Sequence, residues 1–130
     1  MNQIVETNTA PSGLPLTHTF SDGVYAREIF MPKGMIVVGH THKTKHLNIV
    51  STGKAKVWYN GSVKEITAPY TFESEAWMRK VLYIEEDMFW TTIHITDETD
   101  ILKLENDLID KSIDKKEIDN IITKELLWHG

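Results

Sequence analysis

Three histidines lie close together in the first half of the chain, and their spacing is suited to binding a metal ion. His40 and His42 are separated by one residue, so on a β-strand their side chains would lie on the same face. Residues 43–45 leave room for a turn, after which His46 can return to the same cavity from the next strand. Three neutral imidazoles that converge on one point are good ligands for a transition metal. The alternative is that these histidines only form hydrogen bonds on a polar sheet face.

Two glycines frame the histidines at fixed distances. Gly34 is followed by five residues before the His-x-His pair, and six residues separate His46 from Gly53. The stretch 34–53 therefore resembles the first signature of the cupins: a glycine, five residues, His-x-His, three or four residues, a glutamate, six residues and a glycine. His46 stands where the family usually has glutamate. The resemblance implies that the three histidines bind a divalent transition metal, such as zinc, iron, nickel or manganese.

Cupins usually supply a further histidine from a second signature, Pro-x-Gly-x-x-His, on a later strand. That signature is absent, and Arg79 or Lys80 occupies its expected place. A cation at ligand distance from a divalent metal is unfavourable. His94 can replace the missing ligand if its face of the last predicted strand points inward, and Glu75 is a weaker candidate in a loop. The candidate metal ligands are therefore His40, His42, His46 and His94.

Alternation of apolar and polar residues predicts many short strands in the middle of the chain. Val24 to Met31 alternates with period two, and Met35 to His40 is rich in β-branched residues. Asn60-Gly61 is typical of a type I′ hairpin turn. Thr52-Gly53 and Glu85-Glu86-Asp87 are further predicted turns. The pattern predicts an all-β sandwich or barrel, and the resemblance specifies the cupin jelly roll with a C-terminal helical extension.

The two ends of the chain differ in character from the middle. Residues 1–23 are rich in Asn, Thr, Ser, Pro and Gly, and we expect an N-terminal arm there, before a barrel at 24–96. Residues 97–130 contain ten acidic and five basic side chains, whereas the first 96 residues contain nine of each. The net charge of −5 therefore comes entirely from the tail.

The tail is predicted to form two helices, 99–109 and 114–128, because its apolar residues recur at helical spacing. Asp97 or Thr99 is expected to cap the first helix, and Asp114 the second. The acidic residues are interpreted as a solvated helical face. Helices of this length are rarely stable alone in water, so they must pack on the barrel or on a second subunit. We expect a homo-oligomer.

Aromatic and cationic side chains on the predicted strands are candidates for lining a pocket, although aromatic residues on sandwich strands belong more often to the core. His18, in the N-terminal arm, is more typical of a solvent-facing histidine than of a ligand. The pocket candidates are Tyr25, Arg27, Trp58, Tyr59, Arg79 and Trp90.

Composition excludes several classes of function. The chain has no cysteine, which excludes disulfides and thiolate metal sites. It has no basic stripe to support nucleic-acid binding. No apolar run approaches the roughly 18 residues of a membrane span, and no signal peptide is recognised at the N-terminus. We therefore expect a cytoplasmic protein.

Three functions agree with these observations. The first is a metal-dependent enzyme acting on a small molecule, which the clustered histidines favour. The others are a non-catalytic ligand-binding module and a structural or assembly protein, which the missing second signature favours. The stretch from Glu85 to His94, with the acidic segment after it, also resembles small single-domain cupin-like proteins encoded by bacteriophages. That resemblance implies a phage setting, in the host cytoplasm, and no particular reaction.

Overall fold

The computed structural model describes residues 4–7, 14–39, 41–110 and 114–126, with the backbone alone for residues 4–7. His40 lies outside the described residues. The elements are β1 (Ile4–Thr7), β2 (Leu16–Ser21), β3 (Val24–Met31), β4 (Ile36–Gly39), β5 (Thr41–His42), β6 (His46–Tyr59), β7 (Ser62–Thr67), β8 (Tyr70–Ser74), β9 (Lys80–Ile95), α1 (Ile101–Leu108), β10 (Ile109–Asp110), α2 (Lys115–Asn120) and a π-helical segment (Ile121–Leu126) that continues α2.

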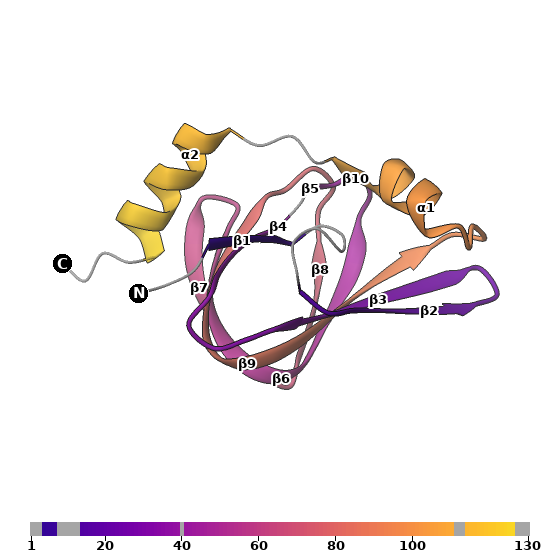
Figure 1. Cartoon of the computed structure of the whole chain (residues 1–130), viewed down its shortest axis with the longest axis horizontal. Coiled ribbons are helices and arrows are strands. Elements are labelled where there is room, and N and C mark those ends of the chain that lie inside the picture. Colours follow the sequence, from indigo (N-terminus) through magenta and orange to yellow (C-terminus); the bar gives the residue numbers. More distant parts are fainter. Residues whose placement is uncertain (1–3, 8–13, 40, 111–113, 127–130) are drawn as a thin grey trace.

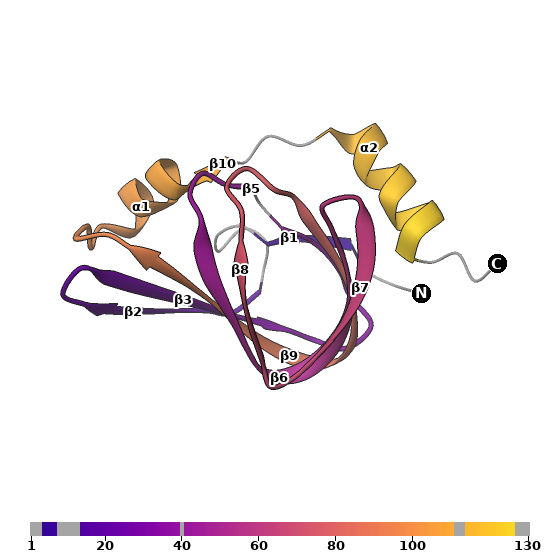
Figure 2. The same ribbon diagram turned by 180° about the vertical axis from the view of Figure 1, so that it is seen from behind.

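Two long antiparallel strands, β6 and β9, form the centre of the fold. On one side of β9 the strand order is β4 and then β1, and on the other it is β3 and then β2. β6 pairs with β7 and β8 as well as with β9. The strands curve around a common interior, and both helical segments lie along the same side of the barrel (Figures 1 and 2). The predicted all-β barrel with a helical extension is confirmed.

The long strands also correct two predicted turns. Thr52-Gly53 lies inside β6, and Glu85-Glu86-Asp87 lies inside β9, opposite one another. The pairing register shifts between Val50 and Ala55, so both strands bend there without ending. Glycine and charged residues occur in a bend within a strand as readily as in a turn between strands, so the sequence does not distinguish the two. The Asn60-Gly61 turn is confirmed, with positive φ at both residues and Tyr59 paired with Ser62.

The barrel interior is apolar at one end. Its buried residues come from alternate positions of the strands, as expected when one face of each strand points inward. At the other end the same inward-facing rows of β3, β6 and β9 contain polar residues, and this end holds the candidate site. The apolar cluster includes Val37, Val50, Ala55, Val57, Leu82, Ile84, Met88 and Trp90.

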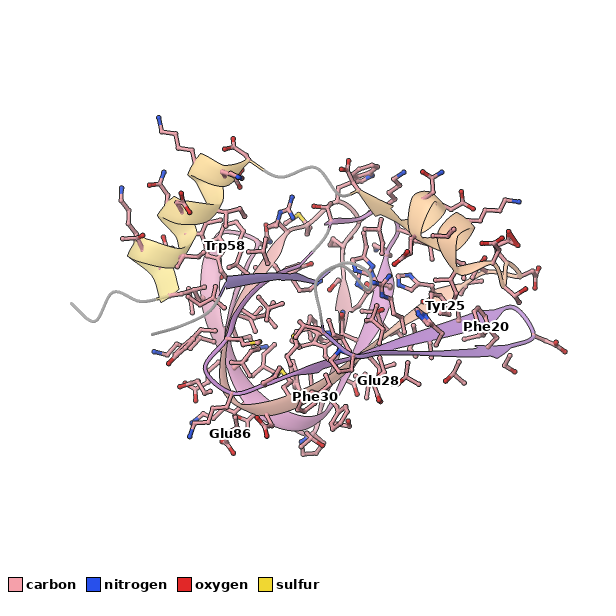
Figure 3. All side chains as sticks on the ribbon, in the orientation of Figure 1. Phe20, Tyr25, Glu28, Phe30, Trp58 and Glu86 are labelled. Carbon is pink, nitrogen blue, oxygen red and sulfur yellow. The ribbon has the colours of Figure 1, made fainter. Side chains whose placement is uncertain are left out.

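The C-terminal tail packs on the barrel of its own chain. The segment from α2 to Leu126 buries its apolar face against Ile36, Val38 and Val81, with Trp58 beside it. α1 covers Tyr25 at the opposite end (Figure 3). Within the part of the chain that the structure describes, no helix is both long enough and apolar enough to span a bilayer. The homo-oligomer stays a prediction.

The helix caps agree with the prediction in one case out of two. Asp114 caps α2 by accepting a hydrogen bond from the Glu117 N–H at 3.1 Å. The cap of α1 is Asp100, which accepts from the Lys103 N–H at 3.2 Å, so the prediction of Asp97 or Thr99 is wrong. All three candidates are good capping residues, and local sequence cannot choose between them.

Candidate metal centre

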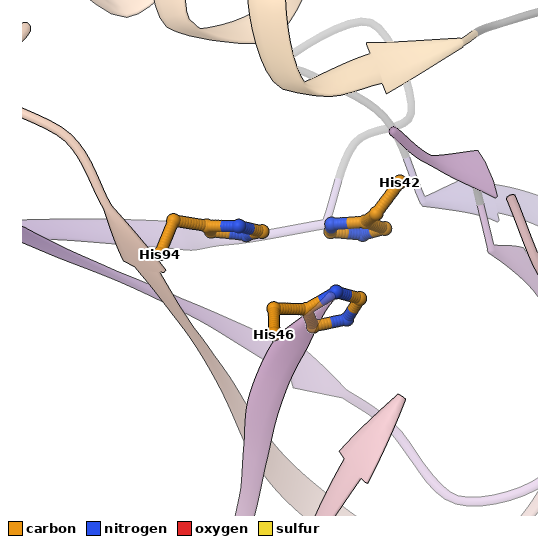
Figure 4. Close-up of side chains that lie close together, drawn as sticks. All are labelled: His42, His46 and His94. Carbon is orange, nitrogen blue, oxygen red and sulfur yellow. The ribbon is translucent and has the colours of Figure 1, made fainter. Parts of the chain in front are cut away.

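Three histidines from three strands meet at the polar end of the barrel. His42 comes from β5, His46 is the first residue of β6, and His94 lies near the end of β9 (Figure 4). β6 and β9 pair with Leu47 opposite Ile93, and their outward side chains alternate with the inward-facing His46 and His94. Both of these histidines are buried, at 4% and 2% exposure.

The imidazole nitrogens of these residues are close enough to share one ion. One ligand atom from each ring lies within 4.8 Å of the other two. His42 Nδ1, His46 Nε2 and His94 Nδ1 are buried, and none has a hydrogen-bond partner among the residues that the structure describes. A buried polar atom without a partner is unfavourable. Three such nitrogens, one from each ring, therefore indicate a site that a further group completes.

A backbone contact fixes the orientation of His46. Its Nδ1 lies 3.0 Å from the carbonyl oxygen of Thr44, so Nδ1–H donates and Nε2 carries the lone pair. Nε2 is the unpartnered, buried nitrogen. Metal-binding histidines usually have their second ring nitrogen held in this way.

All three imidazoles are neutral at pH 7. Burial lowers the pKa of His46 to about 4 and that of His94 to about 3. Burial, together with the positive charge of neighbouring groups, also lowers the pKa of His42 well below its usual value. Neutral rings keep their lone pairs available, which is the state that metal coordination requires.

A pocket lined in part by His42 opens to solvent, with a cavity volume of about 70 Å³. Asn48 anchors one wall, since its amide donates to Ser74 Oγ at 2.7 Å and its Oδ1 accepts from Trp90 Nε1 at 2.9 Å. The lining residues are Arg27, Ile29, Met31, Gly39, His42, Asn48, Lys80, Leu82, Trp90, Thr92 and Ile109.

Comparisons with known proteins identify the fold. No protein-family profile matches the sequence, and no curated protein matches it either. Solved structures do match. An RmlC-like cupin from Shewanella frigidimarina has a TM-score of 0.56 at 20% identity, over 69% of this chain and 81% of the other. An RmlC-like cupin with a double-stranded β-helix fold, from Methanocaldococcus jannaschii, has 0.54 at 8%, over 65% and 81%. The protein has the cupin fold.

KdgF from a Halomonas species is a further similar structure, with a TM-score of 0.56 at 14% identity over 69% of this chain and 85% of the other. At this level of identity the similarity establishes the cupin fold and leaves the chemistry to the site itself. The signature predicted from Gly34 to Gly53 thus lies in a cupin barrel.

The cupin barrel brings together three of the four histidines that the sequence singled out, and His40 lies outside the described residues. Two weaker candidates lie elsewhere. Glu75 is exposed and pairs with Lys45 at 3.5 Å. His18 forms a 2.6 Å hydrogen bond with the Tyr25 hydroxyl and is not one of the three clustered histidines.

Arg27 and Trp90 line the cupin pocket as predicted, whereas four other candidates do not. Tyr25 is covered by α1, and burial raises its pKa to about 12. Trp58 faces α2 because it lies on the outer face of β6. Arg79 donates to the Gly39 carbonyl at 2.7 Å, and the Tyr59 hydroxyl accepts from the Glu75 N–H at 2.9 Å.

Two buried charged residues differ from their sequence-based interpretation. Lys80 was considered only as an obstacle to metal binding, yet it lines the pocket. Glu105 was assigned to a solvated helix face, yet it is 4% exposed and pairs with Arg27. Helical spacing could have indicated that Glu105 is buried, because it lies four residues after Ile101 and three before Leu108, on the apolar face of the helix.

We expect the metal-free cupin to lose stability as the pH falls below about 6.5. Folding lowers the histidine pKa values, so the unfolded chain binds more protons in acid. The stabilisation is complete above the unfolded pKa and is lost as the pH falls toward 4, by roughly 3 kcal/mol for each of these two histidines. Urea unfolding between pH 7 and 4 measures it. In the variant His46→Gln/His94→Gln the free energy of unfolding should depend less on pH. A pH dependence identical to that of the wild type would contradict the prediction.

Proposed function

We propose that this cupin binds a divalent transition metal through His42, His46 and His94 and presents it to a small molecule in the adjoining pocket. The observation that carries the proposal is the cluster of three imidazoles, in which one ring nitrogen of each lies within 4.8 Å of the others and each ring has a buried nitrogen without a hydrogen-bond partner among the described residues. A single ion would provide a partner for all three. Hydrogen bonds on a polar face, the alternative, would not leave one nitrogen of each ring without a partner.

The ligand set fits zinc, iron, nickel or manganese. Three protein ligands leave coordination positions open, as in catalytic metal sites, and a metal bound there supplies a Lewis acid that polarises a carbonyl or activates water. The protein's own part is to hold the rings in place. Thr44 fixes the tautomer of His46, and Asn48 fixes the Trp90 wall against which a ligand would lie.

A second candidate function is ligand binding without catalysis. No carboxylate lines the pocket within the described part of the chain, so its walls offer no carboxylate to act as a general acid or base. The same metal would then anchor a ligand.

Metal content tests the proposal. We expect untagged protein to contain close to one equivalent of a transition metal by plasma mass spectrometry, after purification or after reconstitution with zinc, nickel, manganese or ferrous iron. His46→Ala and His94→Ala should each lower the content at least tenfold. His18→Ala is the matched control, because His18 lies outside the cluster and should leave the content unchanged. Metal retained in both cluster variants, or absent from reconstituted wild type, would refute the site.

A further inference from the structure

Lys80 is a buried cation without a counter-charge among the described residues. It begins β9, is 8% exposed and lines the pocket. Its contact among the described residues is with the Tyr59 ring, whose centroid lies 5.3 Å from Nζ, and no hydrogen bond or ion pair accompanies it. A buried ammonium without an anionic partner is costly. The position therefore favours an anionic partner from outside the described part of the chain.

The pocket around Lys80 has a net positive charge. Arg27, the other cation of the lining, already pairs with Glu105 at 3.3 Å, and no acidic side chain lines the pocket among the described residues. The clustered histidines are neutral, so they do not offset the positive charge of Lys80. The positive charge of Lys80 reaches all three, because it contributes to the lowering of the pKa of each. A ligand that enters this pocket meets an unbalanced positive charge next to the metal ligands.

We propose that Lys80 binds the carboxylate of a small monoanionic ligand whose apolar part lies against the remaining walls. This inference rests on the proposed function, since it names the class of molecule presented to the metal. One ammonium balances one negative charge. Ile29, Met31 and Leu82 provide an apolar surface for the rest of the ligand. A phosphate dianion fits less well, because it carries more negative charge than the Lys80 ammonium balances.

The charge state of Lys80 agrees with this role. Burial lowers its pKa to about 8, so at pH 7 the side chain is still mostly protonated and can pair with a carboxylate. Binding of the anion would favour the protonated form and raise the pKa. Carboxylate affinity should therefore decrease as the pH rises from 7 to 9.

The test uses metal-free protein and two pairs of probes that differ in charge and little in shape: acetate with acetamide, and benzoate with benzamide. NMR titration or calorimetry is expected to show at least tenfold tighter binding of the acid in one or both pairs. Lys80→Met should abolish the preference. Lys33→Met removes the same charge from an exposed lysine and should retain it. No preference in either pair, or one that survives in Lys80→Met, overturns the inference.

A second measurement does not depend on a variant that must fold. The pKa of Lys80 in the wild-type protein is followed by the ¹³Cε chemical shift. Binding of the preferred acid should raise this pKa by about one unit or more, because one unit corresponds to a tenfold preference for the protonated lysine. An unchanged pKa overturns the inference. Failure of the metal site is recognised separately, by the metal content of the histidine variants. Lys80→Met should keep the wild-type metal content, and loss of metal there would make Lys80 a support of the metal site, against the inference.

Discussion

Replacing Glu105 with glutamine is expected to destabilise the protein by about 3–5 kcal/mol. Glu105 Oε2 lies 3.3 Å from Arg27 Nη2, and the two side chains are only 5% and 8% exposed. The contact is ionic, without the alignment of a hydrogen bond, since Oε2 has no hydrogen-bond partner. The substitution leaves the Arg27 guanidinium buried opposite a neutral amide, and the cost is that of a buried charge that has lost its ionic partner Glu105.

Urea unfolding followed by circular dichroism measures this effect. Glu73→Gln is the matched control, because its pair with Lys45 is exposed and at 3.8 Å, and it should change stability by less than about 1 kcal/mol. The double variant Arg27→Met/Glu105→Leu removes both charges and should be more stable than Glu105→Gln. A double variant less stable than Glu105→Gln would show that packing, and not charge, explains the loss.

The Glu105 pair also connects the tail to the candidate metal centre. After α1, β10 pairs with β5, with Ile109 opposite His42. The Lys43 N–H donates to the Leu108 carbonyl at 2.7 Å. We therefore expect Glu105→Gln to increase hydrogen exchange at the Lys43 amide, because local opening of α1 and β10 exposes this bond. Through these contacts the tail holds β5, the strand that contains His42, in place.

The fold could be predicted because its signals are local. Period-two alternation, the Asn60-Gly61 hairpin and the glycine-framed histidines each depend on a few neighbouring residues, and all agree with the barrel. The long strands were misread because a bend within a strand and a turn between strands use the same residues. Only pairing with a distant strand distinguishes the two cases.

The candidate site was predicted in part, for a similar reason. His42 and His46 lie close in sequence, and the inward alternation of β9 allowed His94 to be considered. Lys80 and Glu105 were not recognised, because a charged residue in sequence is normally solvated and only the three-dimensional arrangement shows that it is buried. Trp58 illustrates the opposite error, since an aromatic residue on a strand can face a helix outside the barrel as well as the interior.

Replacing Gly53 with alanine is expected to destabilise the cupin by at least about 3 kcal/mol, more than most single substitutions. Gly53 has φ +104° inside the bend of β6. An added Cβ would lie 2.5 Å from the Asp87 carbonyl oxygen and 2.6 Å from Met88 Cα. These are backbone atoms of β9, so they can be displaced only if β6 and β9 move apart. Thermal or urea unfolding measures the loss.

Gly34→Ala separates the two causes of this effect. Gly34 has φ +90°, so alanine is strained there too, but no atom lies within 4 Å of its added Cβ. The expected loss is the conformational cost alone, about 1–2 kcal/mol. A difference between the variants therefore measures the close approach of β6 to β9. Equal losses of stability in the two variants would mean that backbone conformation alone accounts for the cost of alanine at both positions. The close approach of β6 to β9 would then add no cost at position 53.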